Sequence, residues 1–260
     1  MREKIKRIAK ILLVAFVLFT ALAFWSEKAF NFIKQEIAEE NCYQGTEIAV
    51  LQLNGKIVPY FTNEDEAETS SAEFVSCLEL IKEDGFIEGV VIEISSYGGS
   101  PYASTEIMNA IKNMGKPTVA VIRESAASGG YLIASATDRI FANEVSEIGG
   151  IGVTMSYLDY SQKNKKEGIV FHELSTAKFK NYGDPDKPLT SEEKELIMRD
   201  LKIMHEAFVK NVSKNRGIEI EKVEKLADGS TMLGKMAKEN GLIDEMGDTK
   251  SAKAWLMGMQ

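Results

Sequence analysis

Short β-branched runs separated by helical patterns constrain the fold of this chain more than any other feature. Three runs have the length and composition of buried strands: residues 48–53, 90–94 and 118–122. Between the last two runs, Ile107, Ile111 and Met114 recur with the spacing of one helix face. This order of strand, helix and strand predicts an α/β domain whose layers surround a parallel sheet.

The rest of the chain extends this pattern. Further strands are expected at 140–142 and 169–172, and further helices at 74–81, at 191–215 and just before Gly241. Thr190 and Glu193 have the spacing of a capping box at the start of the long helix, and Gly217 is expected to end it. Four residues form one apolar stripe along that helix: Ile197, Leu201, Met204 and Phe208.

The N-terminus has the pattern of an export signal or a membrane anchor. Residues 1–10 hold five basic side chains and one acidic one, and the uncharged run 11–25 follows them. The main expectation is a retained single-pass anchor: residues 1–26 form the basic flank and the anchor, residues 27–46 a linker, and residues 47–260 the folded domain. A cleaved signal peptide is the alternative. Both interpretations place the acidic remainder of the chain outside the cytoplasm.

Charge and residue counts argue against several classes of function. The net charge of −8 argues against a nucleic-acid binder, because attraction to phosphate requires a basic face. Two histidines without an HExxH pattern argue against a histidine metal centre. The two cysteines, Cys42 and Cys77, are too few for a disulfide scaffold. Reduced thiols are therefore the default expectation, and a single disulfide is the alternative.

The segment from Ser125 to Tyr131 carries the strongest candidate for chemistry. Ser128 follows the expected strand 118–122 and lies where a helix begins, among small neighbours that let a substrate backbone approach. The N-terminus of a helix offers unpaired N–H groups and positive potential, which suits a nucleophile whose attack creates an oxyanion. A close-packed helix start without any chemistry is the alternative for this segment taken alone.

Two further glycine clusters follow strands. Gly98 and Gly99 come after the run 90–94 and permit positive φ, so their N–H groups could turn toward a ligand as half of an oxyanion hole. An ordinary strand-to-helix turn is the alternative. The cluster at 149–152 lacks the frame and the acidic residue of a dinucleotide site, and dinucleotide binding is therefore rejected.

A serine nucleophile needs a base, and several residues near position 175 qualify. His172 and Glu173 are candidates, but Lys178 and Lys180 are better placed, directly after an expected strand and beside aromatic residues. A lysine is a base only when neutral, so its pKa must fall from about 10.4 to about 7–8. This shift corresponds to about 4 kcal/mol, which burial of the amine in apolar surroundings must supply. A solvated surface position is the alternative for either lysine.

Taken in order, five segments resemble signal peptide peptidase A (SppA), a family of membrane-anchored Ser-Lys proteases. The segments are 96–100, 126–131, 148–153, 179–180 and 227–244. The resemblance implies a ClpP/crotonase-type α/β fold, with a core of repeated β-β-α units in a spiral, preceded by one N-terminal transmembrane helix. It extends from about residue 48 to residue 252, which is most of the chain after the expected linker.

The same resemblance assigns the site residues. It implies that Ser128 is the nucleophile and that Lys180, rather than Lys178, is the general base. Gly99, with Gly98 as the near alternative, would form the oxyanion hole together with the N–H of Ser128. Lysine would take the serine proton, an acyl-enzyme would form, and water would release the product. No metal, nucleotide or other cofactor is implied.

Two residues depart from the family pattern. Tyr97 stands where the family usually has proline, which affects the rigidity of the turn. Gly150 stands where the family usually has a serine that hydrogen-bonds the catalytic lysine. Either water, Ser125 or Thr154 substitutes for that serine, or the activity is reduced.

The resemblance also implies partners and a location. It implies a homo-oligomer, such as an octameric ring, with dyads formed between adjacent subunits. The implied substrates are peptides, namely remnants of signal peptides, and the implied location is the bacterial inner membrane with the catalytic domain on the periplasmic side. Two other functions stay open: a membrane scaffold without activity, suggested by Gly150, and a crotonase-type acyl-CoA enzyme.

Overall fold

An eight-stranded sheet organises the chain in this computed structural model, which describes residues 42–62 and 66–258. The strands are β1 (Ile48–Val58), β2 (Glu68–Ser70), β3 (Gly89–Gly99), β4 (Thr118–Ala127), β5 (Arg139–Ala142), β6 (Glu147–Gly149), β7 (Thr231–Leu233) and β8 (Glu245–Met246). The helices are α2 (Ser71–Glu83), α3 (Pro101–Lys112), α4 (Gly129–Ala134), α5 (Ser161–Lys166), α6 (Ser191–Arg216), α7 (Ile220–Leu226), α8 (Gly234–Asn240) and α9 (Thr249–Met257). Residues 46–260 form one compact unit.

The sheet is mostly parallel, as the strand and helix pattern predicts. Its order is β2-β1-β3-β4-β5-β8, and all of these neighbours pair in parallel. The C-terminal part of β4 also pairs with β6, and β6 pairs with β7 in the antiparallel direction. The first six residues of β3 and the first five of β4 are buried. Strands covered on both faces have such continuous apolar runs, which explains why the sequence revealed these two.

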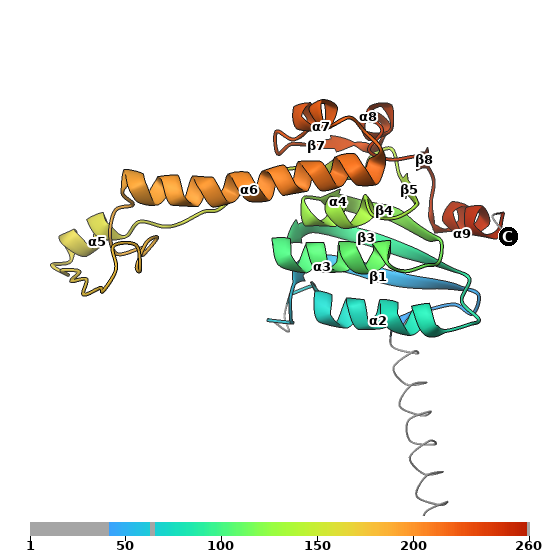
Figure 1. The fold of residues 1–260 in the computed structure, drawn as a ribbon, viewed down its shortest axis with the longest axis horizontal. Helices are drawn as coiled ribbons and strands as arrows, with labels where there is room; N and C mark the ends of the chain where they lie inside the picture. Colours follow the sequence, from blue (N-terminus) through green and yellow to red (C-terminus); the bar gives the residue numbers. More distant parts are fainter. Residues whose placement is uncertain (1–41, 63–65, 259–260) are drawn as a thin grey trace, which may run out of the picture. The chain divides into compact units, whose positions relative to one another are not determined.

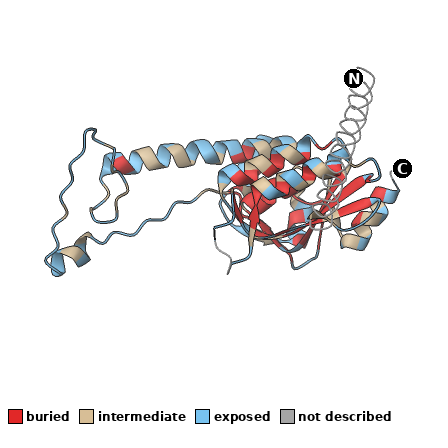
Figure 2. Ribbon diagram, turned by 90° about the horizontal axis from the view of Figure 1, so that it is seen from below, coloured by how far each residue is buried: buried red, intermediate tan, exposed pale blue. Residues whose placement is uncertain are grey.

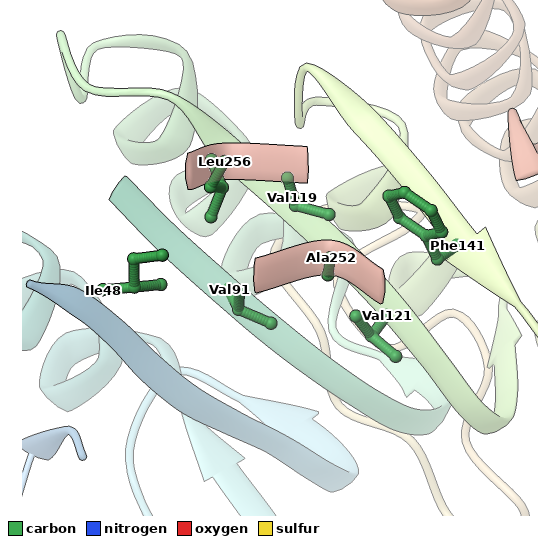
Figure 3. Packing of buried hydrophobic residues seen from close by; sticks show 7 residues of the cluster. All are labelled: Ile48, Val91, Val119, Val121, Phe141, Ala252 and Leu256. Carbon is green, nitrogen blue, oxygen red and sulfur yellow. The ribbon is translucent and has the colours of Figure 1, made fainter. Parts of the chain in front are cut away.

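Helices cover both faces of the sheet. Helices α2, α3 and α4 form a layer over one face, and α9 covers part of the other (Figure 1). Figure 3 shows the apolar cluster under α9, in which Ala252 and Leu256 lie over side chains of β1, β3, β4 and β5. The strand residues of this cluster are Ile48, Val91, Val119, Val121 and Phe141. Burial of apolar area on both faces therefore holds the sheet between its layers.

The helix boundaries follow the signals in the sequence. The side chain of Thr190 accepts a hydrogen bond from the N–H of Glu193, whose own carboxylate accepts from the N–H of Thr190, so the predicted capping box begins α6. Gly217 ends α6 with φ 63°. The helices predicted at 74–81 and before Gly241 are α2 and α8. These predictions are confirmed.

One expectation about the region from 155 to 216 is wrong, and the apolar stripe of α6 is buried only in part. Residues 169–172 form no strand; they belong to residues 155–190 (the arm), an irregular and exposed segment that contains α5 and extends from the core beside α6 (Figures 1 and 2). The apolar stripe of α6 packs on the core only toward its C-terminal end, where Phe208 is buried, whereas Ile197 and Leu201 are partly exposed. The apolar residues of the run 169–172 pair with no strand of the described chain.

Two expectations concern the N-terminal region and the cysteines. No helix among the described residues has the length and the apolar character needed to cross a bilayer. The expected anchor at 11–25 lies outside the described residues. Neither cysteine is free: Cys42 and Cys77 are both disulfide-bonded, so the default expectation of reduced thiols is wrong.

Candidate active site

The candidate site lies where β3 and β4 end side by side. The register pairs Ser96 of β3 with Ala126 of β4, so the turns that follow these strands meet at one edge of the sheet. Ligands of open parallel sheets bind at the carboxyl ends of the strands. The two glycine- and serine-rich segments that the sequence singled out are therefore brought together.

Ser128 occupies a sharp turn between β4 and α4. Its φ of 51° and ψ of −122° give the only positive φ of any non-glycine residue among the described residues. Its carbonyl oxygen accepts hydrogen bonds from the N–H groups of Tyr131 and Leu132, both at 3.0 Å, which ties the turn to the first turn of α4. A non-glycine residue in this region costs about 1–3 kcal/mol, and such strain is concentrated at functional sites.

Close backbone contacts hold Ser128 against the end of β3. A Cβ atom on Gly98 would lie 2.8 Å from the nitrogen of Gly129 and 2.9 Å from the Cβ of Ser128. A Cβ atom on Gly129 would lie 2.2 Å from the Oγ of Ser104 on α3. A side chain at Gly98 would push the two turns apart, and a side chain at Gly129 would collide with α3, so both positions require glycine.

The predicted oxyanion donors differ in their availability. The N–H of Ser128 donates to the carbonyl of Gly149 at 2.9 Å, and the N–H of Gly98 donates to the Oγ of Ser96 at 3.0 Å. Gly99, in contrast, lines the cavity beside Ser128. Gly129 is the first residue of α4, where the helix itself provides no partner for its N–H. The N–H groups of Gly98 and Ser128 are thus engaged within the chain, whereas Gly99 and Gly129 both line the cavity beside Ser128.

Ser128 lies at the junction of two cavities. The α4 cavity has a volume of about 350 Å³ and is bounded on its apolar side by Leu132, Val153, Met204 and Phe208. The β7 cavity has a volume of about 580 Å³, and the ionisable side chains of His205 and Asp228 line it together with Thr231. Ser128 itself is half-buried, and its hydroxyl has no hydrogen-bond partner within the described part of the chain. The hydroxyl is therefore accessible to a ligand from either cavity.

Lys180 does not meet Ser128 in the single chain. It lies on the arm, where its side chain is exposed and its backbone N–H donates to the carbonyl of Ala177 at 3.1 Å. Neither cavity at Ser128 is lined by a lysine or an arginine of the described residues. Any dyad of these two residues must therefore use the lysine of another subunit or a different position of the arm.

Ion pairs distinguish Lys180 from the other basic and acidic candidates on the arm. The Nζ of Lys178 lies 2.6 Å from a carboxylate oxygen of Glu192. Glu173 accepts from Lys187 at 2.8 Å, and this hydrogen bond is the main reason that the pKa of Lys187 is raised. Lys180 forms no ion pair with any described residue, which leaves its amine available.

Three polar side chains at the site were not identified as site residues from the sequence. His205 comes from α6, Asp228 from the turn before β7, and Thr231 from β7, and all three line the β7 cavity with Ser128. Hydrogen bonds from the side chain and the backbone of Ser230 hold the pKa of Asp228 below its usual value. The segment 227–244 contains two of them, but none of the three received a role from the sequence, because each reaches Ser128 only through tertiary packing.

Comparisons with known proteins identify a peptidase family. Residues 110–260 match the model of peptidase family S49. A protein of Enterococcus faecium, provisionally named signal peptide peptidase SppA, is 34% identical over 84% of this chain and 65% of its own length. A protein of Methanocaldococcus jannaschii, provisionally named a protease, is 30% identical over 95% of this chain and 81% of its own length. Protease 4 of Haemophilus influenzae is 30% identical over 79% of this chain, which spans only 33% of that protein.

Proposed function

This chain belongs to peptidase family S49, whose members include serine peptidases of the SppA type, and we propose that it is a serine endopeptidase with a Ser128–Lys180 dyad. The observation that carries the proposal is the strained turn that presents Ser128 between two cavities at the end of a parallel sheet. The parallel strands with helices on both faces are compatible with the ClpP/crotonase-type fold, which is part of the proposal.

The reaction follows the chemistry of an activated hydroxyl. Neutral Lys180 removes the proton of the Ser128 hydroxyl, whose oxygen attacks the carbonyl carbon of a peptide bond. The amine of the substrate leaves with a proton, an ester to Ser128 remains, and water activated by the same lysine hydrolyses it. No step requires a metal or an organic cofactor.

The oxyanion hole is proposed at the ends of β3 and β4. Gly99, with Gly98 as the near alternative, and the N–H of Ser128 are the donors that the family resemblance implies. Because the Ser128 N–H is bonded to Gly149 at 2.9 Å, that donor is released only if this bond breaks. The N–H of Gly129 lies at the same turn and needs no such change, so we assign it the place beside Gly99.

The dyad is proposed to form between subunits of a homo-oligomer, for which an octameric ring is one arrangement. Large apolar side chains are exposed along the arm and on α6: Met155, Leu158, Ile169, Val170, Leu174, Met198 and Ile203. Exposed apolar groups of this extent mark interaction surfaces. Lys180 stands on the same arm, so contacts that cover these groups in a neighbouring subunit also bury its amine, and burial favours the neutral form of a lysine.

The proposed substrates are peptides with an apolar residue beside the scissile bond. Leu132, Val153 and Phe208 offer apolar surface within the α4 cavity next to the Ser128 hydroxyl. A cavity of about 350 Å³ accommodates a large aliphatic or aromatic side chain. Remnants of signal peptides have this composition, and we propose them as the physiological substrates.

The proposed location is the bacterial inner membrane, with residues 11–25 as a single-pass anchor and the catalytic domain on the periplasmic side. The basic flank at 1–10 favours this orientation, since positively charged residues remain on the cytoplasmic side. The oxidised state of Cys42 and Cys77 favours it as well, because disulfides persist in oxidising compartments.

The test is a fluorophosphonate label combined with peptide cleavage by the full-length protein in detergent. We expect the label to react with Ser128, and Ser128→Ala and Lys180→Ala each to abolish both labelling and cleavage. His205→Asn serves as the comparison, because His205 lines the β7 cavity with Ser128 in the same chain. Cleavage that survives Lys180→Ala but not His205→Asn would replace the lysine by the histidine. A folded chain that is never labelled would support the inactive scaffold instead.

A further inference from the structure

A neutral lysine that acts as a base needs a second group to orient its amine. This requirement concerns the mechanism proposed above, and the inference in this subsection rests on that proposed function. A neutral amine has one lone pair and two N–H bonds, and it rotates freely about the Cε–Nζ bond. The lone pair points at the Ser128 hydroxyl only when an acceptor holds one of the N–H bonds, so the site must contain such an acceptor.

The β7 cavity contains few side chains that can accept this hydrogen bond. They are Tyr97, Thr154, His205, Asp228 and Thr231. Asp228 accepts hydrogen bonds from the N–H and the Oγ of Ser230 at 2.9 and 2.6 Å, both on its Oδ1 atom, and it is the charge of Asp228 that makes it unsuitable. A carboxylate favours the protonated form of a neighbouring lysine, which is the inactive form of the base.

Among the others, Thr231 packs directly against the backbone beside the nucleophile turn. In the antiparallel pair of β6 and β7, Thr231 lies opposite Gly149, and the N–H of Gly150 donates to the carbonyl of Ser230 at 3.0 Å. A Cβ atom on Gly150 would lie 3.5 Å from the Cγ2 of Thr231 and 3.2 Å from the nitrogen of Ser128. The branched side chain of Thr231 therefore covers the bare backbone of Gly150, directly beside Ser128.

Thr231 is also available and held in place. Its side chain is exposed, and within residues 42–62 and 66–258 its hydroxyl makes no hydrogen bond. Thr231 belongs to a strand with a defined register, whereas Thr154 belongs to the irregular segment that leads into the arm. Ser125 is buried in β4 and lines neither cavity at Ser128. A hydroxyl on a paired strand holds an amine with less loss of entropy than one on an irregular segment.

We infer that Thr231 is the positioning residue of the base: its Oγ accepts an N–H of the Lys180 amine and directs the lone pair at the Ser128 hydroxyl. A hydroxyl acceptor interacts more strongly with the protonated amine than with the neutral one. The hydroxyl of Thr231 therefore raises the pKa of the base slightly, while it fixes the geometry that makes the base effective. Loss of this hydroxyl should lower both the rate and the pKa that limits activity on the acidic side.

The test compares Thr231→Val, which keeps the shape of the side chain and removes the hydroxyl, with Thr231→Ser, which keeps the hydroxyl. The measurement is kcat/KM as a function of pH for the full-length protein and a fluorogenic peptide with an apolar residue before the scissile bond. For Thr231→Val we expect kcat/KM to fall by about 10- to 100-fold, and the apparent pKa of the acidic limb to shift to lower pH. Thr231→Ser should stay within about threefold of the wild-type value, with its profile unshifted.

Three results would overturn this assignment. The first is a Thr231→Val protein with the wild-type rate and pH profile. The second is a Thr231→Ser protein that is impaired as strongly as Thr231→Val, since the shape of the side chain would then matter and not its hydroxyl. The third is a Thr154→Val protein that shows the shifted profile while Thr231→Val does not. Ser128→Ala separates a failure of the proposed function from a failure of the role of Thr231. If Ser128→Ala still cleaves the peptide, the proposed function fails as well; if it is inactive, only the role of Thr231 is in question.

Discussion

Mixed oligomers of two inactive variants provide a direct test of whether the dyad forms between subunits. Ser128→Ala chains retain the lysine, and Lys180→Ala chains retain the serine. Lys180 is exposed on the arm and lines neither cavity at Ser128 of its own chain. We therefore expect a Lys180→Ala subunit to become active when its neighbour is a Ser128→Ala subunit.

In a random mixture, the expected fraction of active sites depends on which subunit supplies the lysine and not on the number of subunits. In a random 1:1 mixture, half of the subunits supply Ser128 and, independently, half of the relevant neighbours supply Lys180. About one quarter of the sites should then be active if each site takes its lysine from one neighbour. If serine and lysine came from the same chain, no site in the mixture would be complete.

The assay is co-expression of the two variants with different affinity tags, purification through both tags, and measurement of peptide cleavage. A matched control mixes wild-type chains with chains that carry both substitutions. In that control, about one quarter of the sites are active when the dyad forms between subunits, and about one half when it forms within a chain. The two mixtures together distinguish the arrangements without any knowledge of the oligomer size.

One outcome would refute the reasoning. If doubly purified particles contain both variants and remain as inactive as either variant alone, the lysine does not come from the neighbouring subunit. A control mixture with about half of the wild-type activity would add that the arm must reach Ser128 within its own chain.

Three further predictions concern stability. Burial raises the pKa of Glu93, but hydrogen bonds from Thr249 and two other side chains outweigh it and hold the pKa below 4.5. The ionised carboxylate of Glu93 therefore stabilises the fold above about pH 4.5, and this stabilisation is lost as the pH falls through the lowered pKa. The urea midpoint of Glu93→Gln should then change less between about pH 6 and pH 3 than the midpoint of the wild type. An equal change in both proteins would contradict this prediction. Leu256→Ala should lower the free energy of unfolding by about 2–5 kcal/mol, because Leu256 of α9 is only 4% exposed and packs on the sheet. A loss below about 1 kcal/mol in urea unfolding would show that the cluster in Figure 3 contributes little. Tyr131→Phe should cost about 1–3 kcal/mol, since the buried hydroxyl donates to the carbonyl of Leu242 at 2.9 Å, while fluorophosphonate labelling persists; unchanged stability in the same assay would count against that hydrogen bond.

The central strands could be predicted because their apolar composition indicates burial on both faces of the sheet. The runs 90–94 and 118–122 are apolar throughout, as strands covered on both faces must be. The strands themselves continue further, to Gly99 and Ala127, through polar and glycine-rich residues that only the pairing of neighbouring strands keeps extended. The short strands β6 and β7 were not predicted, because a strand of three residues is too short to show a periodic pattern.

The run 169–172 shows the opposite error. Its apolar residues have the composition of a strand, yet Ile169 and Val170 are 55% and 70% exposed on the arm. Composition reports that a segment is suited to burial, but it does not report whether the burial takes place within the chain or against a neighbour. The N-terminal half of the α6 stripe presents the same ambiguity.

The sequence by itself determined the class of the fold, the two ends of α6 and the two turns that contain Ser128 and Gly99, because hydrophobic periodicity, capping and the conformational freedom of glycine act over a few neighbouring residues. Only the tertiary structure decided which groups stand around the Ser128 hydroxyl. The register of β3 on β4 brings the two turns together, and the packing of α6 and β7 adds His205 and Thr231 from about 80 and 100 residues further along the chain. It also separates Lys180 from Ser128 within one chain, because Lys180 is exposed on an arm that extends from the core.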